Sequence, residues 1–179
     1  MKRAHILVDG GIGWALSAGL AQEGFQVADA GVHLALLAVL DPGRLAATPF
    51  VEGGLEVWRA RCDAVLLAAR QAIETARANL AVEGGVIAVL VPAEGMTGAA
   101  GLTAYLAAVE GVRALVKSLG QAWAADSVRI NCIAVEAHVL HHDPNALRRV
   151  AIPLAAQLLS PGHPLSGTTL VAGGGVMAP

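Results

Sequence analysis

Residues 6–13 read Ile-Leu-Val-Asp-Gly-Gly-Ile-Gly, an apolar run that stops at a cluster of glycines. The following stretch, Trp14 to Glu23, carries apolar side chains at helical spacing and ends at Gly24. A buried strand, a tight glycine turn and a helix in this order form the opening of a dinucleotide-binding unit. This stretch therefore predicts a fold in which strands and helices alternate.

Further apolar runs alternate with helical patterns along the rest of the chain. The predicted strands are His33–Leu40, Val86–Val91, Val128–Val135 and Thr168–Ala172. The predicted helices are Leu55–Leu80, Ala104–Ala125 and Pro144–Leu159, the last bent at Pro153. Strands that are apolar throughout are typical of a parallel sheet covered on both faces. We therefore predict a single α/β domain over residues 1–179, with a Rossmann-like, doubly wound, mostly parallel sheet of about five or six strands.

The segment Phe25–Ala28 is ambiguous. It has the composition of a strand, but only about five residues separate it from His33–Leu40, and a parallel crossover takes roughly a dozen or more. On this basis the two segments cannot both be ordinary parallel strands of one sheet. We predict that His33–Leu40 is the strand and that Phe25–Ala28 is a connector or a distorted edge.

The composition excludes several classes of protein. Apolar residues make up 55% of the chain and charged residues 15%, with a net charge of −2, which suggests apolar surface covered by another subunit. Because no basic stripe is present, nucleic acid is not an expected partner. The apolar runs are of strand length, too short for a membrane helix or a signal peptide. Two cysteines without a Cys-x-x-Cys pattern fit buried thiols, so we expect a cytoplasmic protein.

Six segments, in order, resemble motifs of the short-chain dehydrogenase/reductase family. They are residues 6–13, 38–43, 55–58, 84–91 followed by 104–111, 128–134 and 165–174. The resemblance implies a Rossmann fold, NAD(P)-dependent oxidoreductase chemistry, and two long helices that pack against the same pair in a second subunit. Members of the family are longer. The deficit here fits a missing helix–strand–helix block after the first helix and a shortened substrate lid.

The family's chemistry uses a Tyr, a Lys, a Ser and an Asn, and only the Tyr is matched. Tyr105 stands at the Tyr position, whereas the Lys position one helical turn later holds Val109. The Ser position holds Pro92 and the Asn position holds Val65. A phenol without a neighbouring cation has a pKa near 10 and is poorly matched to proton transfer at neutral pH. The favoured interpretation of Tyr105 is a packed, vestigial tyrosine.

The cofactor site is altered as well. Gly10, Gly11 and Gly13 match the family's cofactor-binding glycines, but the loop is about two residues shorter and has Asp9 where Thr is usual. A shorter loop offers fewer backbone N–H groups to a pyrophosphate. Asp29 stands near the distance at which an acidic residue binds the adenosine ribose, on the ambiguous segment. We expect no cofactor, with NAD(P) bound only if the shortened loop still works.

Two polar clusters are weighed against simpler interpretations. His138, His141 and His142 with Asp143 have the composition of a metal site, but a polar loop is favoured and no metal is predicted. Arg148 and Arg149 would suit an anionic ligand, although solvated arginines at a helix start are commoner.

The chain departs from the family at the catalytic and cofactor positions but keeps both long helices, 55–80 and 104–125. Small residues at Ala104, Ala107, Ala108 and Gly111 would let a partner helix approach, although packing within the chain also explains part of them. We predict a non-catalytic subunit that pairs through these helices with a catalytically intact relative. Two alternatives stay open: an NAD(P)-dependent oxidoreductase with an altered site, and a ligand-binding or regulatory protein that uses a cleft near Gly95–Gly101.

Overall fold

The computed structural model describes residues 2–8, 10–160 and 163–173. Six strands form one sheet in the order β2-β1-β3-β4-β5-β6, and every pair of neighbours is parallel. The strands are β1 (Arg3–Leu7), β2 (Gln26–Val27), β3 (Leu34–Ala38), β4 (Gly85–Pro92), β5 (Val128–Val135) and β6 (Thr169–Val171). The predicted fold class, a Rossmann-like α/β sheet of five or six strands, is confirmed.

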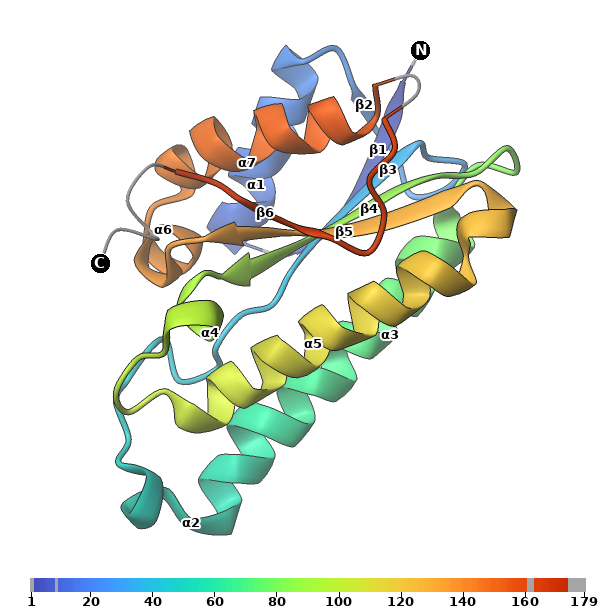
Figure 1. Cartoon of the computed structure of the whole chain (residues 1–179). Coiled ribbons are helices and arrows are strands. Elements are labelled where there is room, and N and C mark those ends of the chain that lie inside the picture. Colours follow the sequence, from blue (N-terminus) through green and yellow to red (C-terminus); the bar gives the residue numbers. More distant parts are fainter. Residues whose placement is uncertain (1, 9, 161–162, 174–179) are drawn as a thin grey trace.

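Helices cover both faces of the sheet (Figure 1). They are α1 (Gly10–Gln22), α2 (Phe50–Trp58), α3 (Ala64–Asn79), α4 (Glu94–Thr97), α5 (Thr103–Ala122), α6 (Ala137–His142) and α7 (Pro144–Leu158). One core lies between the sheet and the pair α1 and α7, and the other between the sheet and the pair α3 and α5. Alternate residues of β4 enter opposite cores, which explains why its whole run is apolar.

The ambiguous segment Phe25–Ala28 contains β2, an edge strand of two residues. Val27 pairs with Ala4 on one side of β1, and Leu34 pairs with the same Ala4 on the other side. A parallel crossover normally needs a helix because the chain must travel back along the full length of the first strand before the second begins. β2 has only two residues, so this return is short, and residues 28–33 reach the other side of β1 without a helix. The argument that both segments could not be parallel strands of one sheet was therefore wrong, while the prediction of a distorted edge is confirmed.

Helix α1 begins at Gly10, four residues earlier than predicted, so residues 10–13 are helical rather than a turn. A Cβ atom on Gly13 would lie 1.9 Å from the carbonyl oxygen of Val8. Glycine is needed at this position because the helix packs directly on the backbone at the end of β1. Gly13 therefore lets α1 lie close to the chain's own backbone at Val8, and not to a bound ligand.

The predicted helix Leu55–Leu80 is helical from Leu55 to Asn79, with two irregularities. Gly54, with φ of 55°, separates it from the first turn of α2, and residues Arg59–Asp63 form a π-helical segment before α3. A π-helical segment accommodates an extra residue per turn and often occurs at functional sites. Here it turns Arg61 and Cys62 inward, where both are buried.

Short helices form in two segments outside the helices predicted from the sequence. The loop from Pro92 to Thr103 includes α4, and the histidine-rich residues 138–142 belong to α6. In the described ranges, no helix is both long and apolar enough to cross a membrane.

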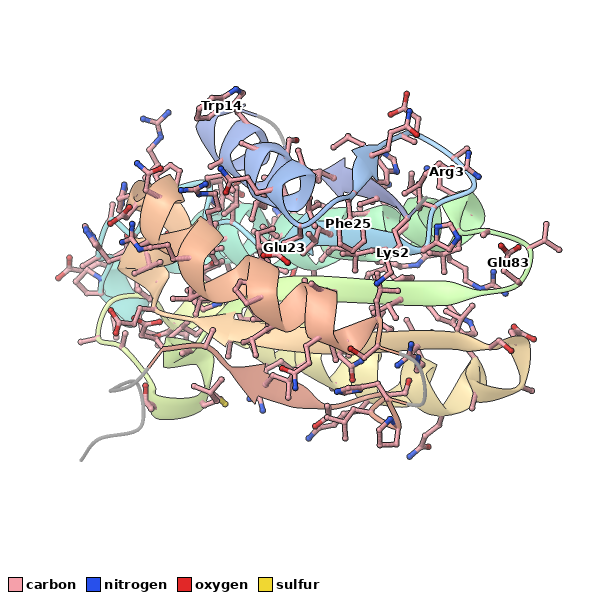
Figure 2. The ribbon with its side chains drawn as sticks, turned by 90° about the horizontal axis from the view of Figure 1, so that it is seen from above. Lys2, Arg3, Trp14, Glu23, Phe25 and Glu83 are labelled. Atoms are coloured by element: carbon pink, nitrogen blue, oxygen red, sulfur yellow. The ribbon has the colours of Figure 1, made fainter. Side chains whose placement is uncertain are left out.

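Figure 2 shows Trp14 projecting from α1 on one side and Glu83 at the turn before β4 at the opposite end of the sheet.

Candidate functional site

Four polar side chains meet at the carboxyl ends of the central strands. Tyr105 comes from α5, His141 from α6, Asp41 from the segment after β3, and Arg61 from the π-helical segment. Loops at this edge of a parallel sheet hold the ligands of α/β proteins, because the strands and the helix N-termini converge there. The four side chains therefore lie where a functional site of this fold is expected.

Tyr105 is completely buried, and its hydroxyl donates a hydrogen bond to the carbonyl oxygen of Val39 at 2.7 Å. The ring nitrogen Nε2 of His141 lies 3.5 Å from the same hydroxyl, and the two rings meet edge to face. Burial is the main cause that raises the pKa of Tyr105 far above its ordinary value, and the negative charges of Asp41 and Glu94 raise it further. The phenol therefore stays protonated and has no exposed surface.

His141 connects α6 to the segment that follows β3. Its Nε2 accepts the backbone N–H of Asp41 at 2.8 Å, and its Nδ1 lies 2.8 Å from the carbonyl oxygen of Ala137. These partners require a neutral ring with the proton on Nδ1. Burial, the largest cause, lowers the pKa of His141, which agrees with a neutral ring. With both nitrogens engaged, His141 is not available as a metal ligand.

Asp41 and Arg61 form a buried, bidentate ion pair. Nε of Arg61 donates to Oδ1 of Asp41 at 2.9 Å, and Nη2 donates to Oδ2. The same carboxylate accepts the backbone N–H groups of Gly43 at 3.0 Å and Leu45 at 2.8 Å. Arg61 also donates to the carbonyl oxygen of Ala46 at 2.7 Å. The pair therefore fixes the conformation of residues 41–46.

That conformation includes two consecutive non-glycine residues in the left-handed region. Arg44 has φ of 49° and Leu45 has φ of 64°. Such a residue costs on the order of 1 kcal/mol or more, and it persists only where its surroundings impose it. The contacts of Asp41 and Arg61 supply that constraint.

A cleft of about 900 Å³ opens beside this cluster, and we call it the α3 cleft. Its lining residues from the ends of β1 and β3, from the two residues after β3 and from α1 are Leu7, Ala38, Val39, Leu40, Gly11 and Ile12. Those from the helix of residues 60–72 are Ala60, Ala64, Val65, Ala68, Ala69 and Ala72. The remaining lining residues, from the segment after β3 and from α6 and α7, are Asp41, Pro42, Arg44, His141, His142 and Pro144. This cleft is of the size usual for small-molecule sites.

The residues at the predicted catalytic positions do not form a catalytic group around Tyr105. Val109, one turn after Tyr105, is completely buried in the same core, and Pro92 ends β4 as a buried residue. Val65 lies on α3 and lines the α3 cleft. The ring of His141 lies beside the hydroxyl of Tyr105. The position at which the family has a lysine holds Val109.

Gly10, Gly11 and Gly13 lie at the beginning of α1. All three belong to the first turns of α1, and the space beside Gly13 is filled by the carbonyl of Val8. Gly10 and Gly11 face open space, and Gly11 lines the α3 cleft. Asp9 lies outside the described residues. Gly10 and Gly11 therefore stand at the N-terminal end of α1 beside open space, while Gly13 packs on the end of β1.

The remaining predicted features differ in their distance from this cluster, and His142 lies beside it, with its ring 6.1 Å from that of His141. The cleft expected near Gly95–Gly101 is not the large one: Gly101 lines only a cavity of about 30 Å³. Arg148 donates to Gln22, and the rings of His138 and His142 are 5.3 Å apart. In the part of the chain that the structure describes, no three His, Cys, Asp or Glu side chains are placed to share a metal ion.

Sequence reasoning missed the roles of His141, Asp41 and Arg61. One signal was available for Arg61, because it stands on the inward stripe of the helix between Trp58 and Val65. A charged residue at such a position requires a buried partner. The sequence does not indicate which acid that partner is, since the π-helical segment that turns Arg61 inward is not visible in the pattern.

Comparisons with known proteins identify the fold. No family model and no curated protein matches the chain. Among solved structures, it is similar to a "Putative oxidoreductase" from Escherichia coli str. K-12, with a TM-score of 0.76 and 16% identity over 99% of this chain and 96% of that one. It is also similar to a blue fluorescent protein from a metagenomic library in complex with NADPH, with a TM-score of 0.71 and 16% identity over 99% and 98%. A third is FabI from Candidatus Liberibacter asiaticus, with a TM-score of 0.70 and 14% identity over 95% and 93%. The chain therefore has the Rossmann-like fold that these proteins share.

Proposed function

We propose that this chain is a non-catalytic, oxidoreductase-like subunit that associates with a catalytically intact relative of the same fold. The observation that carries the proposal is the state of Tyr105, whose hydroxyl is buried and committed to the carbonyl of Val39. A phenol that is held protonated and closed off from the α3 cleft cannot exchange a proton with a bound substrate.

Exposed apolar side chains on α2 and α3 support the association. Phe50, Val51, Leu55 and Leu67 are between 51% and 90% exposed. Exposed apolar side chains gathered on neighbouring helical segments are typical of a surface covered by another protein. On α5, by contrast, most of the small residues serve the chain itself: Ala108 is completely buried, and the Cα of Gly111 faces Leu66 of the same chain. The proposed interface is therefore centred on α2 and α3.

Affinity purification of the tagged chain from its native source tests this proposal. We expect the wild-type chain to recover a Rossmann-fold oxidoreductase with intact Tyr and Lys catalytic residues. The variant Val51→Glu should not recover it, because a buried unpaired carboxylate opposes association. Recovery of the chain only with copies of itself would contradict the proposed role.

A second candidate is an NAD(P)-dependent oxidoreductase with an altered site. It is favoured by the open space beside Gly10 and Gly11 at the end of the α3 cleft, and by the bound NADPH of one structural neighbour. Titration with NADH and NADPH followed by calorimetry separates the two candidates. Clear binding, with turnover lost in Tyr105→Phe, would favour the enzyme, and the absence of binding at millimolar cofactor would exclude it.

A further inference from the structure

We propose that the α3 cleft binds an elongated amphipathic carboxylate, with its apolar body along α3 and its carboxylate at Arg44. This goes beyond the association proposed above and does not depend on it. The inference rests on three features of the cleft: its apolar wall, the single cation left uncompensated at its end, and the rigidity of the segment that carries that cation.

The long wall of the cleft offers no hydrogen-bonding side chain. Ala60, Ala64, Ala68 and Ala72 are spaced four residues apart, so they follow one another along a single face of the helix. The part of this strip in α3, the eight-residue step from Ala64 to Ala72, is about 12 Å long, and Ala60 extends it into the π-helical segment. Leu7 and Leu40 line the opposite side. An aliphatic chain would gain contacts along this strip, whereas the hydroxyl groups of a ribose would lose their hydrogen bonds to water without replacement.

The charged side chains all lie at one end. The carboxylate of Asp41 is already paired with Arg61 and with two backbone N–H groups, and both ring nitrogens of His141 are engaged. Arg44 lines the same end, is exposed, and takes part in none of the ion pairs recorded for the described residues. One positive charge is therefore left to meet a ligand, and a guanidinium binds a carboxylate through two parallel hydrogen bonds.

Arg44 is presented on a fixed backbone. Its left-handed conformation is imposed by the hydrogen bonds from Gly43 and Leu45 to Asp41, and Arg61 holds Asp41 in turn. A binding group that is already held in place loses less conformational entropy when a ligand arrives. The buried ion pair thus acts as a positioning device for the cationic end of the cleft.

Calorimetric titration of the delipidated full-length chain with laurate tests the proposal. We expect one laurate to bind per chain and expect butyrate, which has the head group but little apolar body, not to bind. Arg44→Gln should weaken laurate binding about tenfold, the loss of one charge-assisted contact. Ala68→Phe, which adds a ring at an exposed lining position, should abolish it. Arg149→Gln, an equally exposed arginine outside the cleft, should leave it unchanged.

The contrary outcomes are distinct. No binding of laurate to the wild-type chain, or equal affinity in Ala68→Phe, would overturn the proposal. Displacement of bound laurate by NADPH would also overturn it and would favour the enzyme candidate. If Ala68→Phe changes the sedimentation coefficient but leaves the affinity for laurate unchanged, the cleft is an interface between chains and not a ligand site. The proposed association is tested separately, by affinity purification with the variant Val51→Glu, because Val51 does not line the cleft. Circular dichroism melting of each variant verifies that it folds.

Discussion

The ionisation of the Tyr105 hydroxyl can be measured by its tyrosinate absorbance without a contribution from other tyrosines, because Tyr105 is the only tyrosine of the chain. Its pKa is raised, chiefly by burial, so the folded state keeps the proton at pH values where an unfolded tyrosine, with a pKa near 10, releases it. The contribution of the Tyr105 hydroxyl to the free energy of unfolding is therefore fully present below pH 10 and falls as the pH rises above it. We expect the tyrosinate absorbance of the wild-type chain to appear only together with unfolding. A separate ionisation step in the folded state would contradict the buried geometry.

Asp41 and Arg61 should be strongly coupled in stability. Asp41→Ala leaves a buried guanidinium without its carboxylate, and we expect a loss of about 3–5 kcal/mol. The double variant Asp41→Ala/Arg61→Met removes both charges and should cost less than the sum of the two single changes. Urea unfolding measures all three values. The exposed pair of Arg70 and Glu74 is the matched control, with an expected coupling below about 1 kcal/mol, and simple additivity at the buried pair would disprove the coupling.

His141 should make the stability of the fold sensitive to acid. Its pKa is lowered, mainly by burial, so the unfolded state takes up a proton at a higher pH than the folded state does. Stability from this group is present above the ordinary histidine pKa near 6.5 and is lost as the pH falls below it. We expect the free energy of unfolding to decrease less between pH 7 and 5 in His141→Gln than in the wild-type chain. His138→Gln, at an exposed position, should keep the wild-type slope.

At the level of elements, α1 is positioned by a glycine rather than by a loop. Gly13→Ala would place a methyl group 1.9 Å from the carbonyl oxygen of Val8, so the helix or the strand must move. We expect a loss of several kcal/mol, comparable to severe overpacking. Gly11→Ala, two residues earlier, meets no atom within 4 Å and should stabilise the helix by up to about 1 kcal/mol. Thermal unfolding of the pair measures the contrast, and similar losses in both variants would show that the tight approach at Gly13 is not what matters.

The elements that sequence reasoning predicted are those whose pattern is local. β5 has the predicted bounds, Val128–Val135, because six of its eight residues are apolar and the run is bounded by polar residues, Ser127 and Glu136. The first turn of α1 was misassigned because glycines favour a loop by propensity, while packing on β1 decides for a helix. The sequence places Arg61 on the inward stripe of its helix, but the π-helical form of Arg59–Asp63, which brings Arg61 to Asp41, leaves no trace in the sequence. The candidate site depends on that turn, which explains why Tyr105 was found and its neighbours were not.

At the level of the whole molecule, the apolar surface of α2 and α3 should determine the state of association. Leu67 is 51% exposed in the first turn of α3, on a chain that is 55% apolar. Leu67→Glu would place a carboxylate in the proposed interface, where desolvation opposes binding, and we expect the dissociation constant to rise at least tenfold. Sedimentation velocity over a range of concentrations, for the chain alone and with its purified partner, measures the shift.

A control for that variant lies beyond the C-terminal end of α3, whereas Leu67 is in its first turn. Val82 is completely exposed in the turn before β4, beside Glu83, which Figure 2 places far from Trp14. Val82→Glu adds the same charge to the molecule, so it reproduces any general electrostatic effect on association, and we expect it to sediment as the wild-type chain does. Equal weakening by both variants would indicate that net charge, and not the surface of α2 and α3, governs the assembly. An unchanged association in Leu67→Glu would place the interface elsewhere, and the role proposed for the long helices would then be wrong.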